Sequence, residues 1–275
     1  MDLDLRKLRY FAALAEHLHF GRAAESLYIA QPVLSRQIRA LERELGCALL
    51  ERTTRSVQLT PAGTQLYEEA RGLFTVAESA VRRVREVDRG VERLVVGFAS
   101  GLRVSAALRA FRASHPEVEV ELFQLKWWEQ ELPLRDGRAD IGYLRRPFDD
   151  TGLCTVTVGA EPKIACLPST HRLAAAPAAD RPLLEVDLAG EPVIGAQVRR
   201  TASIEEKFEL IASGHGIAVV PQGVAQAYSR PDLVYRQVMD AEPADICIAV
   251  PEHRRERRVR EFAQVAAATL RQASA

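Results

Sequence analysis

The sequence of 275 residues lacks any apolar run long enough to cross a membrane. It contains no stretch of 18 consecutive apolar residues, and its N-terminus has no basic start followed by an apolar core. A membrane-spanning helix needs about 20 such residues, and a secretory signal needs that basic and apolar order. The sequence therefore predicts a cytoplasmic protein with no membrane partner.

Cysteine is scarce, and the four that occur form no recognisable motif. They are Cys47, Cys154, Cys166 and Cys247, with no C-x-x-C pair among them. Reduced thiols in a cytoplasmic protein are the expected state. A redox pair formed by Cys154 and Cys166 is the alternative, and it rests only on their proximity in the sequence.

Signatures of catalysis and metal binding are also missing. The six histidines show no ligand spacing, and the chain has no H-E-x-x-H segment, nucleophile elbow, phosphate-binding glycine loop or paired carboxylates. We therefore expect no metal, no cofactor and no enzymatic activity.

A net charge of one sign is absent as well, because 37 basic residues balance 37 acidic ones. A protein that coats nucleic acid in bulk needs a large positive charge, whereas a site-specific DNA-binding protein needs only a local basic face. The balance disfavours the first class and leaves the second open.

Residues 31–45 form a helix with two chemically distinct faces. The apolar side chains follow the helical period, at Leu34, Ile38, Leu41 and Leu45. The other face carries side chains that read base edges or bind phosphate, at Gln31, Ser35, Arg36, Arg39 and Arg43. Pro32 suits a first helical turn, and Gly46 suits a helix end. An ordinary surface helix with a solvated basic face is the alternative interpretation.

The segments on either side favour DNA binding. A short helix from Arg22 to residue 27 or 28 is followed by a very short turn, which is typical of a helix-turn-helix whose second helix enters the major groove. Residues 49–51 and 57–59 alternate like two strands around a tight polar turn at residues 52–56, which carries Arg52 and Arg55. This hairpin is a wing that can lie along a phosphate backbone. Thr60 then caps the next helix, and Pro61 opens it.

These motifs resemble the winged helix-turn-helix of LysR-type transcriptional regulators. In order, they are Ala-Ala-x-x-Leu, Gln-Pro-x-x-Ser-Arg-Gln-Ile, Leu-Glu-x-x-Leu-Gly and Leu-Thr-Pro-Ala-Gly, and they cover roughly the first 65 residues. The resemblance implies base and phosphate contacts from four residues of the second helix, namely Gln31, Pro32, Ser35 and Arg36. It places Arg52 and Arg55 where the wing of the family meets DNA.

Two positions depart from the family pattern. Members usually carry Ser or Thr where this chain has Gly21 and Ala30, ahead of the two helices. Both positions therefore lack a capping hydroxyl, and Ala30 should cost more stability than Gly21 because glycine is a tolerable cap.

From Leu66 onward the apolar residues form a heptad seam. They are Leu66, Ala70, Leu73, Ala77, Ala80, Val84 and Val87. Such spacing is typical of a helix that pairs with another helix. We expect a dimerisation helix, as in the LysR-type family, because two recognition helices can then read two half-sites. Packing on its own chain is the alternative.

Beyond residue 94 strands alternate with helices. Strands are expected at residues 94–98, 118–122, 139–144, 164–167, 193–195, 217–220 and 246–250, and helices at 105–114 and 129–138. The alternation predicts an α/β domain with a parallel sheet. Motifs such as Ser-Gly-His-Gly-Ile-Ala-Val-Val-Pro at residues 213–221 resemble the two-subdomain effector-binding part of LysR-type regulators, which is similar to periplasmic binding proteins.

By this resemblance an effector lies in the cleft between the subdomains, near Ser100, Gly101 and Trp127. Ser100 follows a strand and precedes a helix, where backbone N–H groups can hold a carboxylate. A plain helix-start serine is the alternative. Trp127 stands where members often have a small hydroxyl residue, so it would fill cleft volume or stack on an aromatic ligand, or else pack in the core.

The segment after Gly195 departs further from the family. A parallel crossover needs about a dozen residues, and few separate Gly195 from the polar segment at residues 198–200. We therefore expect the helical crossover to be missing, the second subdomain to be shortened, and its side of the cleft to be incomplete. The effector response should then be weak or absent, unless the shortened subdomain admits a larger ligand.

The sequence thus predicts a LysR-type transcriptional regulator without catalysis. Expected are a winged helix-turn-helix (residues 1–60), a linker helix (61–90) and an α/β effector-binding domain (91–275). The expected partners are double-stranded promoter DNA, a second copy in a homodimer or homotetramer, and a small organic acid. A small-molecule sensing protein with a degenerate cleft is the alternative function, and an enzyme built on the α/β domain is a third.

Overall fold

The computed structural model describes residues 4–52, 57–175, 182–194, 201, 203–254 and 256–274. The chain divides into two compact units, Met1–Arg82 and Arg83–Ala275. The division falls within the long helix α4 (Pro61–Asp88), which therefore contributes to both units. No helix in the described part is both long enough and apolar enough to cross a membrane.

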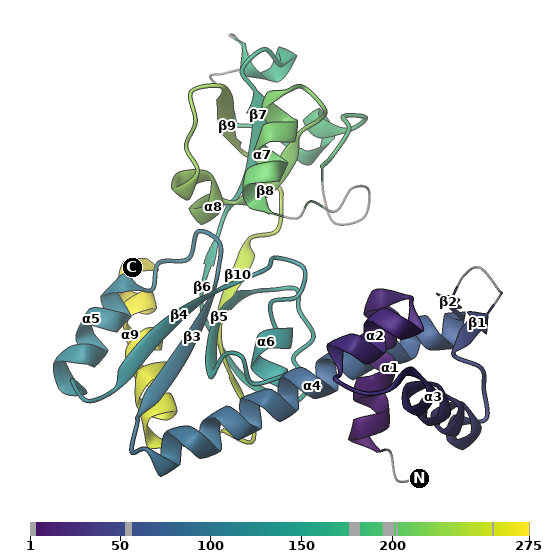
Figure 1. Cartoon of the computed structure of the whole chain (residues 1–275). Coiled ribbons are helices and arrows are strands. Elements are labelled where there is room, and N and C mark those ends of the chain that lie inside the picture. Colours follow the sequence, from purple (N-terminus) through teal and green to yellow (C-terminus); the bar gives the residue numbers. More distant parts are fainter. Residues whose placement is uncertain are drawn as a thin grey trace. The chain divides into compact units, whose positions relative to one another are not determined.

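The first unit is a helical bundle with a two-stranded wing. Its elements before α4 are α1 (Leu5–His17), α2 (Phe20–Ser26), α3 (Gln31–Leu45), β1 (Leu50–Arg52) and β2 (Val57–Leu59). The predicted apolar stripe of α3 is confirmed, since Leu34, Ile38 and Leu41 are fully buried. They pack with Phe11 and Leu14 of α1 in one core, and Figure 1 shows α1, α2 and α3 grouped beside the wing.

The helix ends follow the sequence in part. Ala30 precedes α3 and makes no side-chain capping hydrogen bond, as predicted, and Gly46 ends α3 in the left-handed conformation with φ of 70°. The prediction for Gly21 is wrong, because α2 begins at Phe20 and Gly21 lies inside it. His19 is the actual cap, and its Nδ1 accepts a hydrogen bond from the backbone N–H of Arg22 at 3.2 Å.

The wing joins α4 through a close backbone approach. β1 and β2 are antiparallel, with Leu50 opposite Leu59. Thr60 caps α4 as predicted, because its Oγ1 accepts a hydrogen bond from the backbone N–H of Gly63 at 2.9 Å. A Cβ added at Gly63 would lie 2.1 Å from the carbonyl oxygen of Leu49. Only glycine fits there, because the strand leading into the wing rests directly on the first turn of α4.

The second unit contains a five-stranded sheet in the order β4-β3-β5-β10-β6. The strands are β3 (Arg93–Ala99), β4 (Glu119–Leu125), β5 (Ile141–Arg145), β6 (Leu153–Glu161) and β10 (Ala244–Pro251). β3 is parallel to β4 and β5, whereas β10 is antiparallel to β5 and β6. The sheet is therefore mixed, and the prediction of a parallel sheet holds only for its first three strands.

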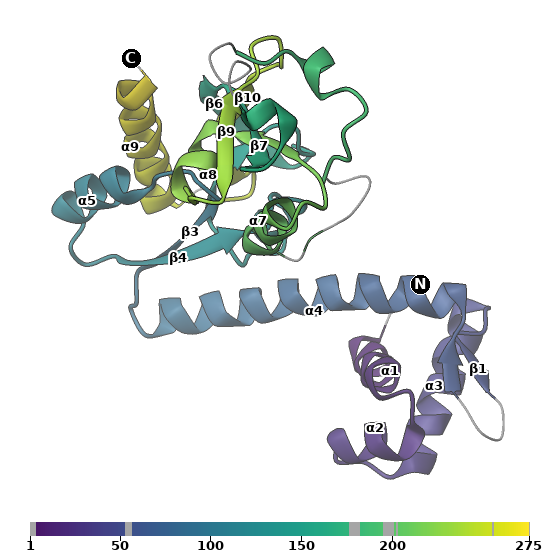
Figure 2. The same ribbon diagram turned by 90° about the horizontal axis from the view of Figure 1, so that it is seen from above.

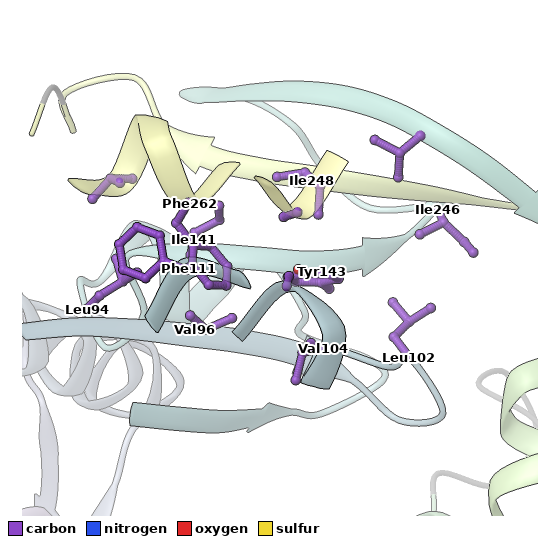
Figure 3. Close-up of a cluster of buried hydrophobic side chains, with 14 of the residues drawn as sticks. Leu94, Val96, Leu102, Val104, Phe111, Ile141, Tyr143, Ile246, Ile248 and Phe262 are labelled. Atoms are coloured by element: carbon purple, nitrogen blue, oxygen red, sulfur yellow. The ribbon is translucent and has the colours of Figure 1, made fainter. Parts of the chain in front are cut away.

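Two helices, α5 (Ser105–Ser114) and α9 (Arg257–Ser274), lie side by side against one face of this sheet (Figure 1). Phe111 of α5 meets Phe262 of α9 edge to face at 5.2 Å between ring centroids. Both rings pack over Tyr143 and Ile141 of β5 in the largest buried cluster, as Figure 3 shows.

The opposite face of the sheet packs against the short helix α6 (Leu132–Arg135), through Val95 and Leu134. This helix is shorter than the predicted span of residues 129–138. Pro133 fixes the first turn of α6. Gln130 is instead held by its side chain, which bonds the main chain of Arg145.

A smaller subdomain carries the three-stranded antiparallel sheet β8-β7-β9. Its strands are β7 (Lys163–Pro168), β8 (Ala218–Pro221) and β9 (Leu233–Gln237). Its helices are α7 (Ile204–Ala212) and α8 (Gln222–Ala227), with single turns η1 (Arg172–Ala174) and η3 (Glu185–Leu188).

The expectation of no helical crossover after Gly195 is wrong. Val193 and Ile217 form a parallel bridge, and α7 lies between them along the chain. Gly195 itself and the polar segment at 198–200 lie outside the described residues. The predicted strand at 193–195 is reduced to the single bridge at Val193.

The chain crosses between the two subdomains twice. β6 passes through Pro162 directly into β7, and the chain returns from β9 into β10 (Figure 2). β6 and β10 are antiparallel neighbours up to Glu161 and Ala244, so the two crossings leave the larger sheet side by side.

Gly63→Ala should destabilise the first unit by about 3 kcal/mol or more, because the new methyl group overlaps a backbone carbonyl that cannot swing away. Gly72→Ala is the matched control. It lies in the same helix with no atom within 4 Å of the added Cβ, and alanine there should raise stability by up to about 1 kcal/mol. Urea unfolding of both variants measures the difference, and equal stabilities would contradict the close approach.

Candidate nucleic-acid interface and ligand cleft

The polar face of α3 is open to solvent. Gln31, Pro32, Arg36 and Arg39 are exposed, and Ser35 is half-buried. Neither Arg36 nor Arg39 forms an ion pair within the described part of the chain. The helix therefore presents unneutralised guanidinium groups on the side opposite its buried stripe, which is what contact with phosphates and base edges requires.

The wing is described only at its base. Arg52 is the last residue of β1, and the turn at 53–56, which includes Arg55, lies outside the described residues together with the side chain of Arg52. Their assignment to DNA contact stays a prediction.

Tyr28 is a surface feature that the sequence pattern did not single out. It lies in the turn between α2 and α3 with φ of 55°, a left-handed conformation that is uncommon for an aromatic residue. Its side chain is 96% exposed. Its neighbours Leu27 and Ile29 in the same turn pack against the core, so the sequence alone does not single out Tyr28 as the exposed one.

The heptad seam of α4 divides into two parts. Leu66 and Ala70 pack against the core of the first unit, as the alternative interpretation required. Farther along, Leu73, Val84 and Val87 are exposed. This outer part leaves an apolar stripe without an intramolecular cover.

The second unit holds a cleft of about 550 Å³ between its two subdomains. The larger subdomain and the segments beside it contribute Ala99, Ser100, Trp127, Trp128, Gln130, Glu131, Arg145, Arg146, Pro147 and Phe148. The smaller subdomain contributes Val193, Ile194, Ile204, Lys207, Val219, Val220, Pro221 and Val224. The prediction of an incomplete second wall is therefore wrong, because α7, β8 and α8 supply it.

Two of the three predicted cleft residues line this cavity. Ser100 and Trp127 do so, and the indole of Trp127 meets that of Trp128 edge to face at 5.4 Å. Gly101 does not line it. It has φ of 81°, and a Cβ there would lie 2.5 Å from the carbonyl carbon of Gly223. Gly101 instead lets the two subdomains approach each other.

A buried ion pair lies at the first crossing between the subdomains. Arg145 donates through Nε to Glu161 and through Nη1 to the carbonyl of Ser100. The other oxygen of Glu161 accepts a hydrogen bond from the backbone N–H of Gly223 at 2.6 Å. Burial lowers the pKa of Arg145, and the charge of Glu161 opposes that shift. The guanidinium nitrogen Nη2 of Arg145 has no partner in the described structure.

Lys207 of α7 is the residue of the cleft that the sequence did not reveal. It is only 7% exposed, and its Nζ lies 4.3 Å from the ring centroid of Trp127. No carboxylate of the described residues lies within ion-pair distance of it. Burial lowers its pKa below the ordinary value of 10.5, and the nearby Cys166 opposes this slightly. Lys207 could not be recognised from the sequence, because it follows two glutamates and its burial depends on the contact of α7 with Trp127.

Lys207→Met should stabilise the ligand-free protein by about 1 kcal/mol at pH 7, because it removes a buried ammonium group without a counter-ion and keeps the volume. The folded-state pKa of Lys207 is depressed, so the native state loses this proton before the unfolded state does. Wild-type stability relative to the variant should therefore rise as the pH approaches 10.5.

Chemical unfolding at pH 7 and pH 10 measures the free energy of unfolding of both proteins, and the difference between them should be smaller at pH 10. Lys126→Met, at an exposed lysine that pairs with Glu129, should change stability by less than about 0.5 kcal/mol at pH 7. A Lys207→Met protein that is less stable than the wild type at pH 7 would show that Lys207 is satisfied in the fold.

Comparison with known families agrees with this architecture. A family model described as a bacterial regulatory helix-turn-helix protein of the lysR family matches residues 5–64. A second, described as the LysR substrate binding domain, matches residues 85–271.

Individual relatives span nearly the whole chain. The HTH-type transcriptional regulator YnfL of Escherichia coli (strain K12) is 36% identical over 241 residues, which cover 85% of this chain and 80% of the relative. The HTH-type transcriptional regulator AlsR of Bacillus subtilis (strain 168) is 30% identical over 260 residues, with 86% of each chain covered.

Among solved structures, CbnR, a LysR family transcriptional regulator, matches with a TM-score of 0.67 at 23% identity. The match covers 99% of this chain and 100% of that one, and at this identity it shows the fold alone. On the family models and the relatives together, the chain belongs to the LysR family of DNA-binding transcriptional regulators, which are not enzymes.

Proposed function

We propose that this regulator binds promoter DNA as a homodimer or homotetramer, with the N-terminal end of α3 in the major groove. The exposed, unpaired polar face of α3 opposite its buried stripe carries this proposal. CbnR has been solved in complex with its target DNA, at 24% identity to this chain and a TM-score of 0.64.

Within α3, the position along the helix assigns different roles to the polar residues. Gln31 and Ser35 lie in the first turns, where a recognition helix meets base edges, and Pro32 fixes the start of the helix. Arg36 and Arg39 follow on the same face, where a guanidinium group can bind a guanine edge or a phosphate. Arg52 and Arg55 of the wing would add phosphate contacts.

The outer seam of α4 is the proposed dimer contact. Leu73, Val84 and Val87 are apolar and exposed, and a second copy of the same helix would bury them. Two first units joined in this way would read two half-sites of one operator.

The cleft of the second unit is the proposed site of a small organic acid effector. Its volume lies within the range of small-molecule sites, and its walls are mostly apolar with a few polar groups. Because the proposed function is binding to promoter DNA, we place the protein in the cytoplasm.

Arg36→Ala should weaken operator binding by about 1–3 kcal/mol while leaving the fold intact, because Arg36 is exposed and its removal opens no cavity. Arg109→Ala is the control, since it removes an exposed arginine from α5 of the second unit. Gel-shift titration of both variants on operator DNA measures the effect. Equal affinity of Arg36→Ala and the wild type would refute the recognition-helix assignment.

Leu73→Asp should break the dimer, because it places a carboxylate in the seam of both chains. Operator affinity should fall with it, since the two half-sites are no longer held together. Glu78→Lys changes the charge at an exposed position of α4 that lies off the seam, and it should leave the dimer intact. Sedimentation velocity measures whether each variant is a monomer or a dimer. A Leu73→Asp protein that remains dimeric would show that the dimer interface does not lie on the α4 seam.

A further inference from the structure

The cleft contains an uncommon surplus of hydrogen-bond donors without partners. Two of its lining residues carry a buried N–H group without a partner, Arg145 at Nη2 and Trp127 at Nε1, and a third, Lys207, makes no hydrogen bond or ion pair with the described residues. Arg145 and Lys207 are both more than nine-tenths buried. A largely buried ammonium group without a counter-ion costs free energy, and a ligand that brings a carboxylate to Lys207 would offset that cost.

Among the described residues that line the cleft, only one cation lacks a counter-ion. Arg145 is neutralised by Glu161, and Arg146 is paired with Asp150 at 2.9 Å. Lys207 has no such partner, and its ammonium group rests only on the face of Trp127. Glu131 is the single acid among the described lining residues, and it does not come within 4.0 Å of Lys207. The described part of the cleft therefore has one unmatched positive charge, placed by the smaller subdomain.

We propose that Lys207 is the residue that selects the effector, and that it does so by binding a carboxylate on a ligand with a flat apolar body. This inference rests on the proposed effector role of the cleft. An uncharged ligand of the same shape would leave Lys207 without a counter-ion.

The apolar side chains that line the cleft indicate the shape of the part of the ligand that does not carry the carboxylate. Trp128 and Phe148 bring aromatic rings to the larger-subdomain side, and Ile204 and Val219 bring branched aliphatic groups to the other side. Trp127 also lines a second, smaller cavity of about 140 Å³. Ser100, Trp128 and Ile204 line both cavities as well, so the smaller cavity lies next to the cleft.

The position of Lys207 connects binding to the arrangement of the subdomains. Lys207 belongs to α7 of the smaller subdomain, whereas Trp127 and Arg145 belong to the larger one. A ligand whose carboxylate pairs with Lys207 and whose body packs on the wall of the larger subdomain adds a bridge between the two that is absent without ligand. A ligand that shifts a conformational equilibrium must bind the two states differently, and this bridge supplies the difference.

Calorimetric titration of the full chain tests the proposal with matched pairs of probes. Benzoate is compared with benzamide, and hexanoate with hexanamide, because each pair differs mainly in charge. We expect at least one acid to bind with a Kd below about 1 mM and its amide to bind at least about tenfold more weakly. Lys207→Met should reduce acid affinity by at least about tenfold and leave amide affinity unchanged, whereas Lys207→Arg should retain most of the acid affinity.

Glu131→Gln is the control within the same cavity, and it should bind the acid at least as tightly as the wild type. The proposal is overturned if neither acid binds below about 1 mM, if amide and acid bind alike, or if Lys207→Met keeps the acid affinity. Weaker acid binding by Glu131→Gln would overturn it as well, by pointing to a zwitterionic ligand. If the amide binds as tightly as the acid, the role of Lys207 is refuted but the cleft remains an effector site. If binding persists when Trp127 and Phe148 are replaced by alanine, the ligand does not bind in the cleft, and the proposed effector site is refuted as well.

Discussion

The geometry of the second unit depends on the buried ion pair between Arg145 and Glu161. Arg145 ends a strand of the larger sheet, and Glu161 stands where the chain leaves that sheet for the smaller subdomain. Through its second oxygen Glu161 also holds the backbone of Gly223, and Gly101 admits this backbone because it lacks a Cβ. Breaking such a buried pair by removing one partner costs about 3–5 kcal/mol. The ligand cleft, which Arg145 also lines, is thus built around a fixed polar joint.

In the first unit, the single helix α3 meets two structural requirements. A recognition helix must bury enough apolar surface to be held firmly and still present an unneutralised polar face. Leu34, Ile38 and Leu41 meet the first requirement, and Arg36 and Arg39 meet the second. The missing cap at Ala30 shows that tertiary packing, rather than the helix terminus, supplies the stability of α3.

The sequence specified those features that rest on local periodicity. The stripe of α3, the cap at Thr60, the wing strands and the uncovered outer part of the α4 seam all follow from spacing within one element. The mixed sheet could not be read in this way, because β10 comes from the far end of the chain and its direction depends on long-range pairing. Gly21 was misjudged because the histidine before α2, rather than a hydroxyl residue, acts as its cap.

The cleft shows the same limit. Ser100 and Trp127 were predictable from their place in a family pattern, but Lys207 was not, because its burial arises only when α7 is brought against Trp127 from another subdomain. The missing crossover was inferred from a short polar segment, and α7 shows that a helical connection is nevertheless made. The number of residues between two expected strands does not predict the connection when one of those strands is only a single bridge, as at Val193.

The place of β10 has a consequence for the order in which this protein can form on the ribosome. β10 lies between β5 and β6 in the larger sheet, yet it is synthesised after the whole smaller subdomain. Until residues 244–251 and the helix that follows them emerge, β6 has no neighbour in the larger sheet, and the face later covered by α9 stays open. The smaller subdomain is continuous in sequence and can fold first. A nascent chain that stalls or ends before β10 therefore exposes the apolar interior of the larger subdomain, so loss of the last thirty residues would damage the middle of that sheet rather than its margin.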